Sequence, residues 1–310
     1  MFGKKKAKET KIESTEKSVK RQRGLLGAKK EKVEPEPQYF KSAINTRVDN
    51  YRVYYLTRRE KVLYFLLAFA AGAFVGYTFY GGIGKNEFGE PTFLTYFLNT
   101  VISVSVGITA GVVFLPIRQK QILEKRQKKL RRQFRDMLEC FSTSLGAGKN
   151  VPDSFASAYN DLSNQYEEGA FILNELQVLN VGIRNGENAE DLMRDFGRRS
   201  GVQDIEDFAN VFEISYRGGG NIKDIIRNTY EILSDKMQIS EEIETMITGS
   251  KSELNLLLVL PIGMVLLIKN SSPDFAANFA TPAGIVSTTI ALGFTVAAYL
   301  IGRKIMDFGV

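Results

Sequence analysis

The sequence predicts an all-α membrane protein: four transmembrane helices form two hairpins that bracket a cytoplasmic antiparallel bundle of about six helices. Three observations lead to this fold class. Four apolar runs of 15 to 27 residues carry no charged side chain. Basic residues concentrate in alternate segments between these runs, as the positive-inside rule expects of cytoplasmic regions. The long segment between the second and third runs has apolar residues at helical spacing and no strand-like alternation.

The composition disfavours most enzyme classes. The chain has 310 residues, with 41 Lys and Arg, 35 Asp and Glu, no His and a single cysteine, Cys140. Without His there is no imidazole metal site, no Ser-His or Cys-His pair and no histidine phosphorelay. One Cys permits neither an intramolecular disulfide nor a multi-cysteine zinc site. We therefore expect no catalytic residue, no cofactor and no metal, and hence a protein that is not an enzyme.

Residues 1–61 are predicted to be a basic, mostly disordered cytoplasmic arm. They hold 18 Lys and Arg against eight acids, a composition typical of solvated segments. They are not a secretory signal peptide, because the first long apolar run begins only at Val62. Late in the arm, Tyr51 and Tyr54 stand among basic residues, which suits the lipid headgroup layer. Nucleic-acid binding is the weaker interpretation, since a membrane span follows directly, and no nucleic acid is expected as a partner.

The four apolar runs are residues 62–83, 93–117, 254–268 and 276–302. About 20 helical residues are needed to cross the hydrocarbon layer, so the third run, at 15 residues, is short. A buried or re-entrant hairpin is the alternative for that run. Pairing the runs in order gives transmembrane hairpins over residues 62–117 and 254–310, the second of which includes a short tail.

Positive charge sets the predicted topology. Loops 84–92 and 269–275 carry one Lys each, whereas residues 118–135 carry nine basic residues and the tail carries Arg303 and Lys304. Both termini and the segment between the hairpins are therefore expected to be cytoplasmic.

The predicted spans contain no ionisable residue, which argues against an ion-coupled transporter. Small residues such as Gly72, Gly76, Gly107 and Gly111 favour close helix packing, within the chain or between subunits.

Residues 118–253 are predicted to form a helical domain that begins with a basic collar, residues 118–135. The collar is expected to continue the second span as one helix into the headgroup zone, where each basic residue gains about 1 kcal/mol from anionic lipid. Its basic residues are Arg118, Lys120, Lys125, Arg126, Lys128, Lys129, Arg131, Arg132 and Arg135. From residue 136 to residue 253 the balance reverses to ten basic and 22 acidic residues, which predicts a surface that attracts a basic partner.

One pattern, G-x-N-x-x-D, recurs three times between the predicted helices of this domain. Glycine ends one helix in the left-handed conformation, asparagine caps the next, and the acid complements that helix's amino-terminal dipole. The residues are Gly148, Asn150, Asp153, Gly186, Asn188, Asp191, Gly219, Asn221 and Asp224. We interpret them as structural turns, with an additional contact to a partner as the alternative, because turns cluster at the ends of a bundle.

Two features imitate catalytic motifs. Residues 146–150 read GAGKN, but a P-loop needs a preceding strand and a Ser or Thr where Asn150 stands. Cys140 shares an apolar helix face with Leu138 and Phe141, so we expect an inert core thiol.

Taken together, these features resemble the F-domain membrane proteins of type II secretion and type IV pilus machines, and most closely the TadB branch of tight-adherence (type IVc) pilus systems. The segments that carry the resemblance are LGAGKNVPDSF at 145–155, NGENAEDL at 185–192 and RGGGNIKDII at 217–226, with Pro261 in the third span. In that family an L-x-A-G turn opens the domain and a G-G-x-L turn precedes its last long helix. Here Ile222 replaces the Leu. The resemblance covers residues 62–305, and the sister protein TadC is alike in outline.

The resemblance implies a non-enzymatic platform in the plasma (inner) membrane. Its partners would be a hexameric secretion ATPase, a sister TadC-like F-domain protein and pilin subunits, in a homo- or hetero-oligomer. Asp204, Glu206 and Asp207 are the candidate ATPase contacts. The collar and a hinge near Glu253 would carry motion to the spans, and pilin helices would move along the small-residue faces. The alternatives are a membrane-tethered signalling scaffold and a transporter with an unrecognised polar path.

Overall fold

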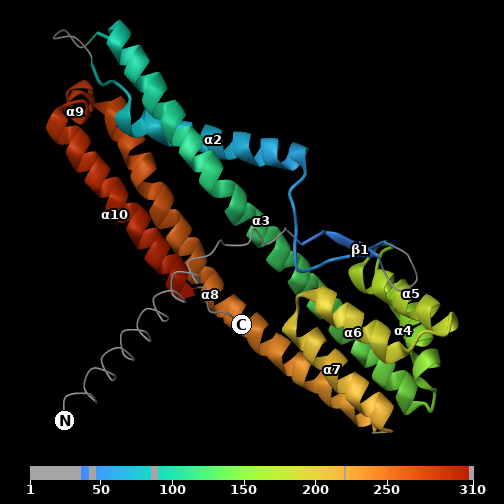
Figure 1. Cartoon of the computed structure of the whole chain (residues 1–310). Coiled ribbons are helices and arrows are strands. Elements are labelled where there is room, and N and C mark those ends of the chain that lie inside the picture. The colour runs from blue at the N-terminus through green and yellow to red at the C-terminus, as the bar shows by residue number, and fades with distance from the viewer. Residues whose placement is uncertain (1–35, 42–46, 85–89, 220, 307–310) are drawn as a thin grey trace, which may run out of the picture. The chain divides into compact units, whose positions relative to one another are not determined.

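The computed structural model of the chain describes residues 36–41, 47–84, 90–219 and 221–306. The chain divides after Pro37 into two units, and every element below belongs to the second, Gln38–Val310. The described part is largely helical, which confirms the predicted class (Figure 1). Its only strands are β1 (Tyr39–Lys41) and β2 (Arg47–Asp49), which pair antiparallel.

Four helices are long and apolar enough to cross a membrane. They are α2 (Arg58–Tyr80), α3 (Phe93–Gly146), α8 (Ile222–Ser271) and α10 (Pro282–Met306). In the most apolar stretch of each helix at most 22% of the residues are buried, so large apolar side chains point outward, as contact with lipid requires. The short third run lies inside the unbroken α8, which α9 (Pro273–Phe279) joins to α10, so this run is not a re-entrant hairpin.

The helices α3 and α8 each continue from an apolar stretch into the charged part of the chain. α3 has 54 residues, and its course through residues 118–135 confirms that the collar extends the second apolar run. α8 has 50 residues and passes through Glu253 and Pro261 without a break, so the expected hinge near Glu253 is wrong. Between Ile222 and Glu253 the helix contains one glycine, Gly249, and no proline. A single glycine lowers helix propensity but does not by itself interrupt a helix.

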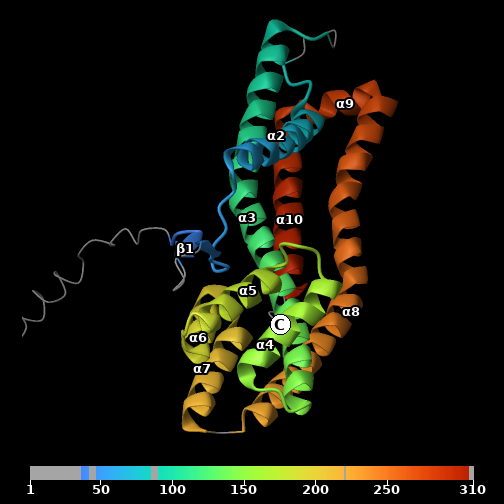
Figure 2. The same cartoon turned by 90° about the vertical axis from the view of Figure 1, so that its right-hand side faces the viewer.

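Four shorter helices pack with the charged halves of α3 and α8: α4 (Val151–Gln165), α5 (Phe171–Arg184), α6 (Ala189–Ser200) and α7 (Gln203–Gly218). We call this assembly, residues 118–253, the helical domain (Figures 1 and 2). Its core contains phenylalanine rings in stacked and edge-to-face contact. The ring centroids of Phe141 and Phe155 lie 4.3 Å apart, and those of Phe134 and Phe208 lie 5.4 Å apart. All four side chains are buried.

Glycines let α2 and α3 approach each other closely. A Cβ atom at Gly72 would lie 2.6 Å from the Cβ of Ala110, and one at Gly107 would lie 2.9 Å from the carbonyl oxygen of Phe69. The predicted small-residue faces therefore pack within the chain. Each of these faces therefore covers the other within the chain.

Candidate functional site

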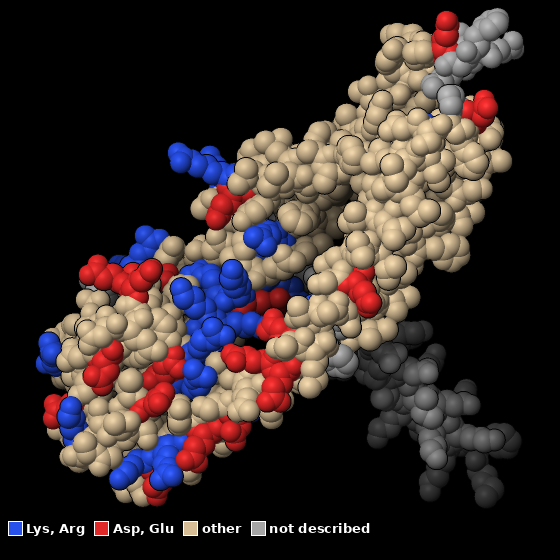
Figure 3. Space-filling model, turned by 180° about the vertical axis from the view of Figure 1, so that it is seen from behind, with Lys and Arg blue, Asp and Glu red and all other residues tan. Residues whose placement is uncertain are grey.

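Charged side chains gather over the helical domain, whereas the visible surface of the apolar helices carries few of them (Figure 3). Polar contacts that could serve a function therefore lie on the helical domain and where it joins the apolar helices.

The three G-x-N-x-x-D turns gather at one end of the helical domain, which we call the distal end. Arg217, just before the third turn, donates a hydrogen bond of 3.0 Å from Nη2 to Asp191 in the second. A Cβ atom at Gly146, just before the first turn, would lie 4.0 Å from Cε of Lys223 in the third. The opposite end, where α6 meets α7 beside the collar, is called the near end.

The turns have the predicted backbone. Gly148, Gly186 and Gly219 have φ angles of +87°, +91° and +71°, in the left-handed region that favours glycine. The side chain of Asn150 accepts the N–H of Asp153 at 2.8 Å, and that of Asn221 accepts the N–H of Asp224 at 3.4 Å. These contacts confirm two of the three predicted caps.

The second turn departs from the prediction, because Asn188 makes no side-chain cap. Its Nδ2 instead donates to Oδ2 of Asp191 at 3.1 Å. This hydrogen bond, together with the charges of Arg217 and Arg194, lowers the pKa of Asp191. Asn188 therefore orients the carboxylate that links this turn to the third.

At the distal end, two arginines connect α6 to α7 through ion pairs. Arg217 forms ion pairs with Glu190, Asp191 and Glu213 at 3.0–3.2 Å. Arg194 pairs with Asp191 at 2.9 Å and with Glu213 at 3.0 Å. This network could not be predicted from the sequence, because the partners are up to 27 residues apart and no local pattern joins them.

The collar is divided between two environments. In residues 126–135 Leu130 and Phe134 are fully buried in the core, and Arg131 pairs with Asp204 at 2.7 Å. The other basic residues of this part also have partners within the chain: Arg126 with Asp49, Lys128 with Glu244, Arg132 with Glu241, Arg135 with Asp136, and Lys129 over the ring of Phe171. This part of the collar thus packs as part of the helical domain.

In residues 118–125 the one ion pair is local, between Lys120 and Glu124 at 3.5 Å on the exposed surface of α3. Lys120 and Lys125 are exposed, and Arg118 is half-buried over the ring of Tyr64 at the start of α2. Contact with anionic lipid stays a prediction for these three residues.

The acids expected to contact the ATPase lie at the near end. Asp204 forms ion pairs with Arg131 and Lys236, each at 2.7 Å, so its negative charge is compensated within the chain. Glu206 is half-buried, and only Asp207 is exposed among the three. Asp204 and Asp207 line a groove of about 730 Å³ between α3, α8 and the start of α7.

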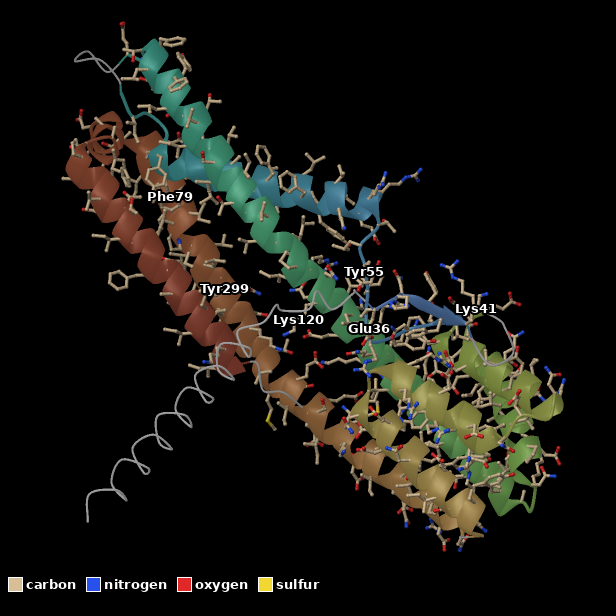
Figure 4. The ribbon with its side chains drawn as sticks, in the orientation of Figure 1. Glu36, Lys41, Tyr55, Phe79, Lys120 and Tyr299 are labelled. Atoms are coloured by element: carbon tan, nitrogen blue, oxygen red, sulfur yellow. The ribbon has the colours of Figure 1, made fainter. Side chains whose placement is uncertain are left out.

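Residues 50–57, which we call the strap, connect β2 to α2 and form hydrogen bonds with the helical domain along their length. Tyr51 is 1% exposed, and its N–H donates to the carbonyl of Arg199 at 2.8 Å. Gln127 and Gln119 of α3 donate to the carbonyls of Tyr51 and Tyr54 at 3.0 Å and 2.7 Å. Figure 4 shows the neighbouring Tyr55 and Lys120 in this part of the molecule.

The strap changes two expectations. Tyr51 lies in the core of the helical domain and not in the headgroup layer. Its ring is buried there, and its hydroxyl donates a hydrogen bond to the buried Glu175. The predicted disordered arm also has an ordered end, since residues 38–41 and 47–57 are held by β1, β2 and these hydrogen bonds. Residues 1–35 and 42–46 lie outside the described residues.

A buried ion pair lies beneath Tyr51. Arg199 binds Glu175 through two hydrogen bonds of 3.0 Å and 2.8 Å, and both side chains are at most 5% exposed. Tyr51 Oη donates to Glu175 at 3.1 Å, and Arg199 also donates to the carbonyl of Asp49 and to Asp195. Burial raises the pKa of Glu175, and the hydrogen bonds from Arg199 and Tyr51 oppose that shift. The cluster therefore connects the strap, α5 and α6 through buried hydrogen bonds.

Lys269 ties α8 to the end of α2. Its Nζ donates to the carbonyl oxygens of Thr78 at 2.8 Å, Phe79 at 3.2 Å and Gly81 at 3.3 Å. A cation at a helix C-terminus satisfies carbonyls that lack partners within the helix and complements the dipole. Phe79 is labelled at this junction in Figure 4. Tyr80 adds a hydrogen bond of 2.9 Å to Thr289 of α10.

The described residues offer little for catalysis. Among them, no group of three or more Cys, Asp and Glu side chains is placed to hold a metal ion. Burial raises the pKa of the Cys140 thiol to about 11, which keeps it protonated and unreactive at neutral pH. Residues 146–150 follow the helix α3 rather than a strand, so they lack the P-loop context.

No protein-family model, no curated protein and no solved structure matches the chain. The assignment of function therefore rests on the residues and on this geometry.

Proposed function

We propose that this chain is a non-enzymatic inner-membrane platform of a type II secretion or Tad-like pilus assembly machine, which couples a cytoplasmic secretion ATPase to pilin movement. The observation that carries the proposal is the continuity of α3 and α8. At about 1.5 Å per residue these helices are about 80 Å and about 75 Å long. A continuous helix that joins a domain to a membrane span passes a displacement of the domain to that span.

In this proposal α2 with α3, and α8 with α10, form two transmembrane hairpins, and the helical domain is a cytoplasmic antiparallel bundle. The basic arm and collar support a cytoplasmic position for both termini. The order of the three G-x-N-x-x-D turns between the hairpins supports the F-domain likeness, with TadB as the favoured branch.

The ATPase would dock on the distal end, because both long helices end there. Gly146 ends α3, Ile222 begins α8, and Lys223 of α8 lies near the end of α3, with its Cε 4.0 Å from a Cβ atom placed at Gly146. A force applied at this end acts on both helices at once. The strap adds a third link, since Tyr51 fastens the segment before α2 to the buried Glu175.

Pilin helices would meet the outward face of α10, because the small-residue faces of α2 and α3 are covered. Val286, Ile290 and Phe294 on α10 are 58%, 54% and 73% exposed. They form an apolar surface at helical spacing that a transmembrane pilin helix can contact.

The test is affinity capture of the tagged chain from its own organism, followed by mass spectrometry. Asp153→Arg and Glu187→Arg reverse exposed charges at the distal end, and Asp207→Arg makes the same change at the near end. We expect the unaltered chain to retain a hexameric secretion ATPase and a second F-domain protein. ATPase recovery should fall about tenfold or more in the distal variants, because like charges across an interface cost several kcal/mol, and should persist in Asp207→Arg.

Two results would contradict the proposal. One is a preparation without either protein, under conditions that preserve other membrane complexes. The other is recovery of a soluble regulator while pilus assembly proceeds normally in a strain that lacks this chain, which would favour the signalling scaffold.

A further inference from the structure

The hairpin of β1 and β2 has an open strand edge. The N–H of Asn50 donates to the carbonyl of Gln38 at 2.9 Å, so these two residues are a hydrogen-bonded pair. Bonded and non-bonded pairs alternate along an antiparallel ladder, so the next bonded pair is Phe40 with Val48. The residues of β1 on either side of Phe40 therefore turn their backbone groups away from β2.

These outward backbone groups belong to Tyr39 and Lys41. Among the described residues the sheet has two strands, so β1 has a neighbour on one side only. No backbone hydrogen bond from the described part of the chain reaches the N–H of either residue from the open side. Tyr39 and Phe40 are 41% and 37% exposed, so the strand is accessible from solvent. An open edge of this kind pairs with extended segments of other chains.

A pocket adjoins this edge. It has a volume of about 420 Å³ and lies between the hairpin and α5. Tyr39 lines it on the hairpin, and Val178 and Val181 line it on α5. Val181 is 38% exposed although it lies in a pocket. This lining offers a place for one apolar side chain of a ligand.

Strand geometry places one side chain of an added strand beside the pocket. Successive side chains of a strand point to opposite faces, so Tyr39 and Lys41 share one face of the hairpin, and residues directly opposite them on a neighbouring strand share that face too. In an antiparallel third strand, the residue opposite Lys41 comes first and the residue opposite Tyr39 follows two positions later. This later residue lies on the side of the pocket, because Tyr39 lines it.

Charge complementarity selects an acid for the earlier position. Lys41 is exposed at the end of β1, where Figure 4 labels it. Its cross-strand partner is Arg47, whose Cζ lies 3.6 Å from the ring centroid of Tyr39. Neither cation has an acidic partner among the described residues. The acids that line the pocket are already in ion pairs, Asp49 with Arg126 and Glu175 with Arg199.

We propose that β1 binds an extended segment of another protein as a third, antiparallel strand. An acidic residue of that segment lies opposite Lys41, and an apolar residue two positions later enters the pocket. The outward backbone groups of β1 supply hydrogen bonds to the segment, while the cations and the pocket supply specificity. This inference goes beyond the pilus role and rests on the hairpin and α5, so it stands or falls independently of the ATPase.

Peptide binding to the full chain in detergent tests the site. The probe is a fluorescein-labelled peptide, STETLTS, in which the acid precedes the apolar residue by two positions. One control peptide, STKTLTS, carries a cation in place of the acid. The other, STLTETS, has the acid and the apolar residue in the opposite order. Fluorescence anisotropy measures the dissociation constant of each peptide.

Three variants separate the parts of the site, and each has a matched control. Tyr39→Pro removes an outward N–H and leaves the ladder with β2 intact, whereas Tyr39→Thr keeps that N–H. Lys41→Glu reverses the cation at the edge, and Lys251→Glu makes the same change at an exposed lysine of α8. Val181→Lys places a charge in the pocket, and Val211→Lys does so at a position of α7 that is 45% exposed and lies outside it.

We expect saturable binding of STETLTS to the unaltered chain. Its dissociation constant should rise about tenfold or more in each site variant relative to its control, because a hydrogen bond, a charge pair or the apolar contact is lost. Both control peptides should bind about fivefold or more weakly than the probe. Equal thermal midpoints within each pair of variants verify that both are folded. No saturable binding of the probe, or equal affinities in every variant and its control, would overturn the proposal. Equal affinity for STLTETS would overturn the antiparallel register.

Discussion

At the scale of single residues, the most consequential group is the buried cluster of Tyr51, Glu175 and Arg199. A buried ion pair adds little net stability, because the loss of hydration offsets the attraction, but removal of one partner leaves an uncompensated charge. Here both oxygens of Glu175 accept hydrogen bonds, and Arg199 binds four acceptors on three parts of the chain. The cluster therefore specifies where the strap lies on the domain.

Replacement of Arg199 by Met should destabilise the protein by about 3–5 kcal/mol, because Glu175 stays buried without its cation. The double variant Glu175→Leu, Arg199→Met should recover a large part of that loss. Chemical denaturation of the purified chain in detergent measures both. A single variant as stable as the unaltered chain would mean that the cluster does not hold the strap.

The Arg199→Met variant should also become less stable as pH rises. Burial raises the Glu175 pKa above its ordinary 4.5, and this variant lacks the Arg199 hydrogen bonds and charge that oppose the shift. Above that pH the unfolded chain has released a proton that the folded variant still holds, so the free energy of unfolding falls with pH. Denaturation at pH 5 and pH 8 should show the larger deficit, relative to the unaltered chain, at pH 8.

Lys269→Met should loosen the contact between α8 and α2. The three carbonyls at the end of α2 lose their shared donor, at a cost of about 1–3 kcal/mol, whereas Lys269→Arg should retain most of the contact. Lys251→Met is the matched control, because Lys251 is an exposed lysine of the same helix outside the junction. Thermal unfolding in detergent compares the three variants, and equal midpoints for Lys269→Met and Lys251→Met would contradict the assigned role.

At the scale of elements, the repeated turns define where helices begin and end. Each G-x-N-x-x-D turn joins a helix that arrives at the distal end to one that leaves it, and each needs glycine where φ is positive. The acid at the third position contributes in two ways. In the first and third turns its N–H is capped, and in the second its carboxylate binds the arginines of α6 and α7.

Gly148→Ala should destabilise the protein by about 1–2 kcal/mol, because a side chain in the left-handed region crowds the backbone. Gly218→Ala is the control, since Gly218 lies within α7, has open space around it and should gain up to about 1 kcal/mol from helix propensity. Chemical denaturation in detergent distinguishes them. The same sign of change in both variants would mean that backbone conformation does not limit the first turn.

At the scale of the whole molecule, local and repetitive features could be predicted from the sequence. The apolar runs, the helix continuing through the collar and the glycine turns depend on neighbouring residues. The strap, the Glu175–Arg199 pair and the arginine network depend on residues up to 150 apart, whose meeting no local pattern encodes. The same limit explains Asp204: its charge could be read from the sequence, but its neutralisation by Arg131 and Lys236 required the fold.

The sequence also left open which surfaces the small residues would contact. Gly72 and Gly107 fit a packing face within the chain as well as one between chains, because both use close backbone approach. Only the fold assigns them to the α2–α3 contact.

In the proposed function, α8 acts as a rigid link between the helical domain and the membrane. Residues 248–253 are exposed throughout, so they can be changed without loss of packing. A Gly-rich replacement of these six residues costs about 1 kcal/mol of helix propensity per residue relative to Ala and breaks the link, whereas an Ala-rich replacement of the same length keeps it. The measurement is surface pilus assembly in each variant, alongside recovery of the ATPase by capture. We expect both variants to retain the ATPase and only the Ala-rich variant to assemble pili; normal assembly by the Gly-rich variant would mean that α8 is not a rigid link.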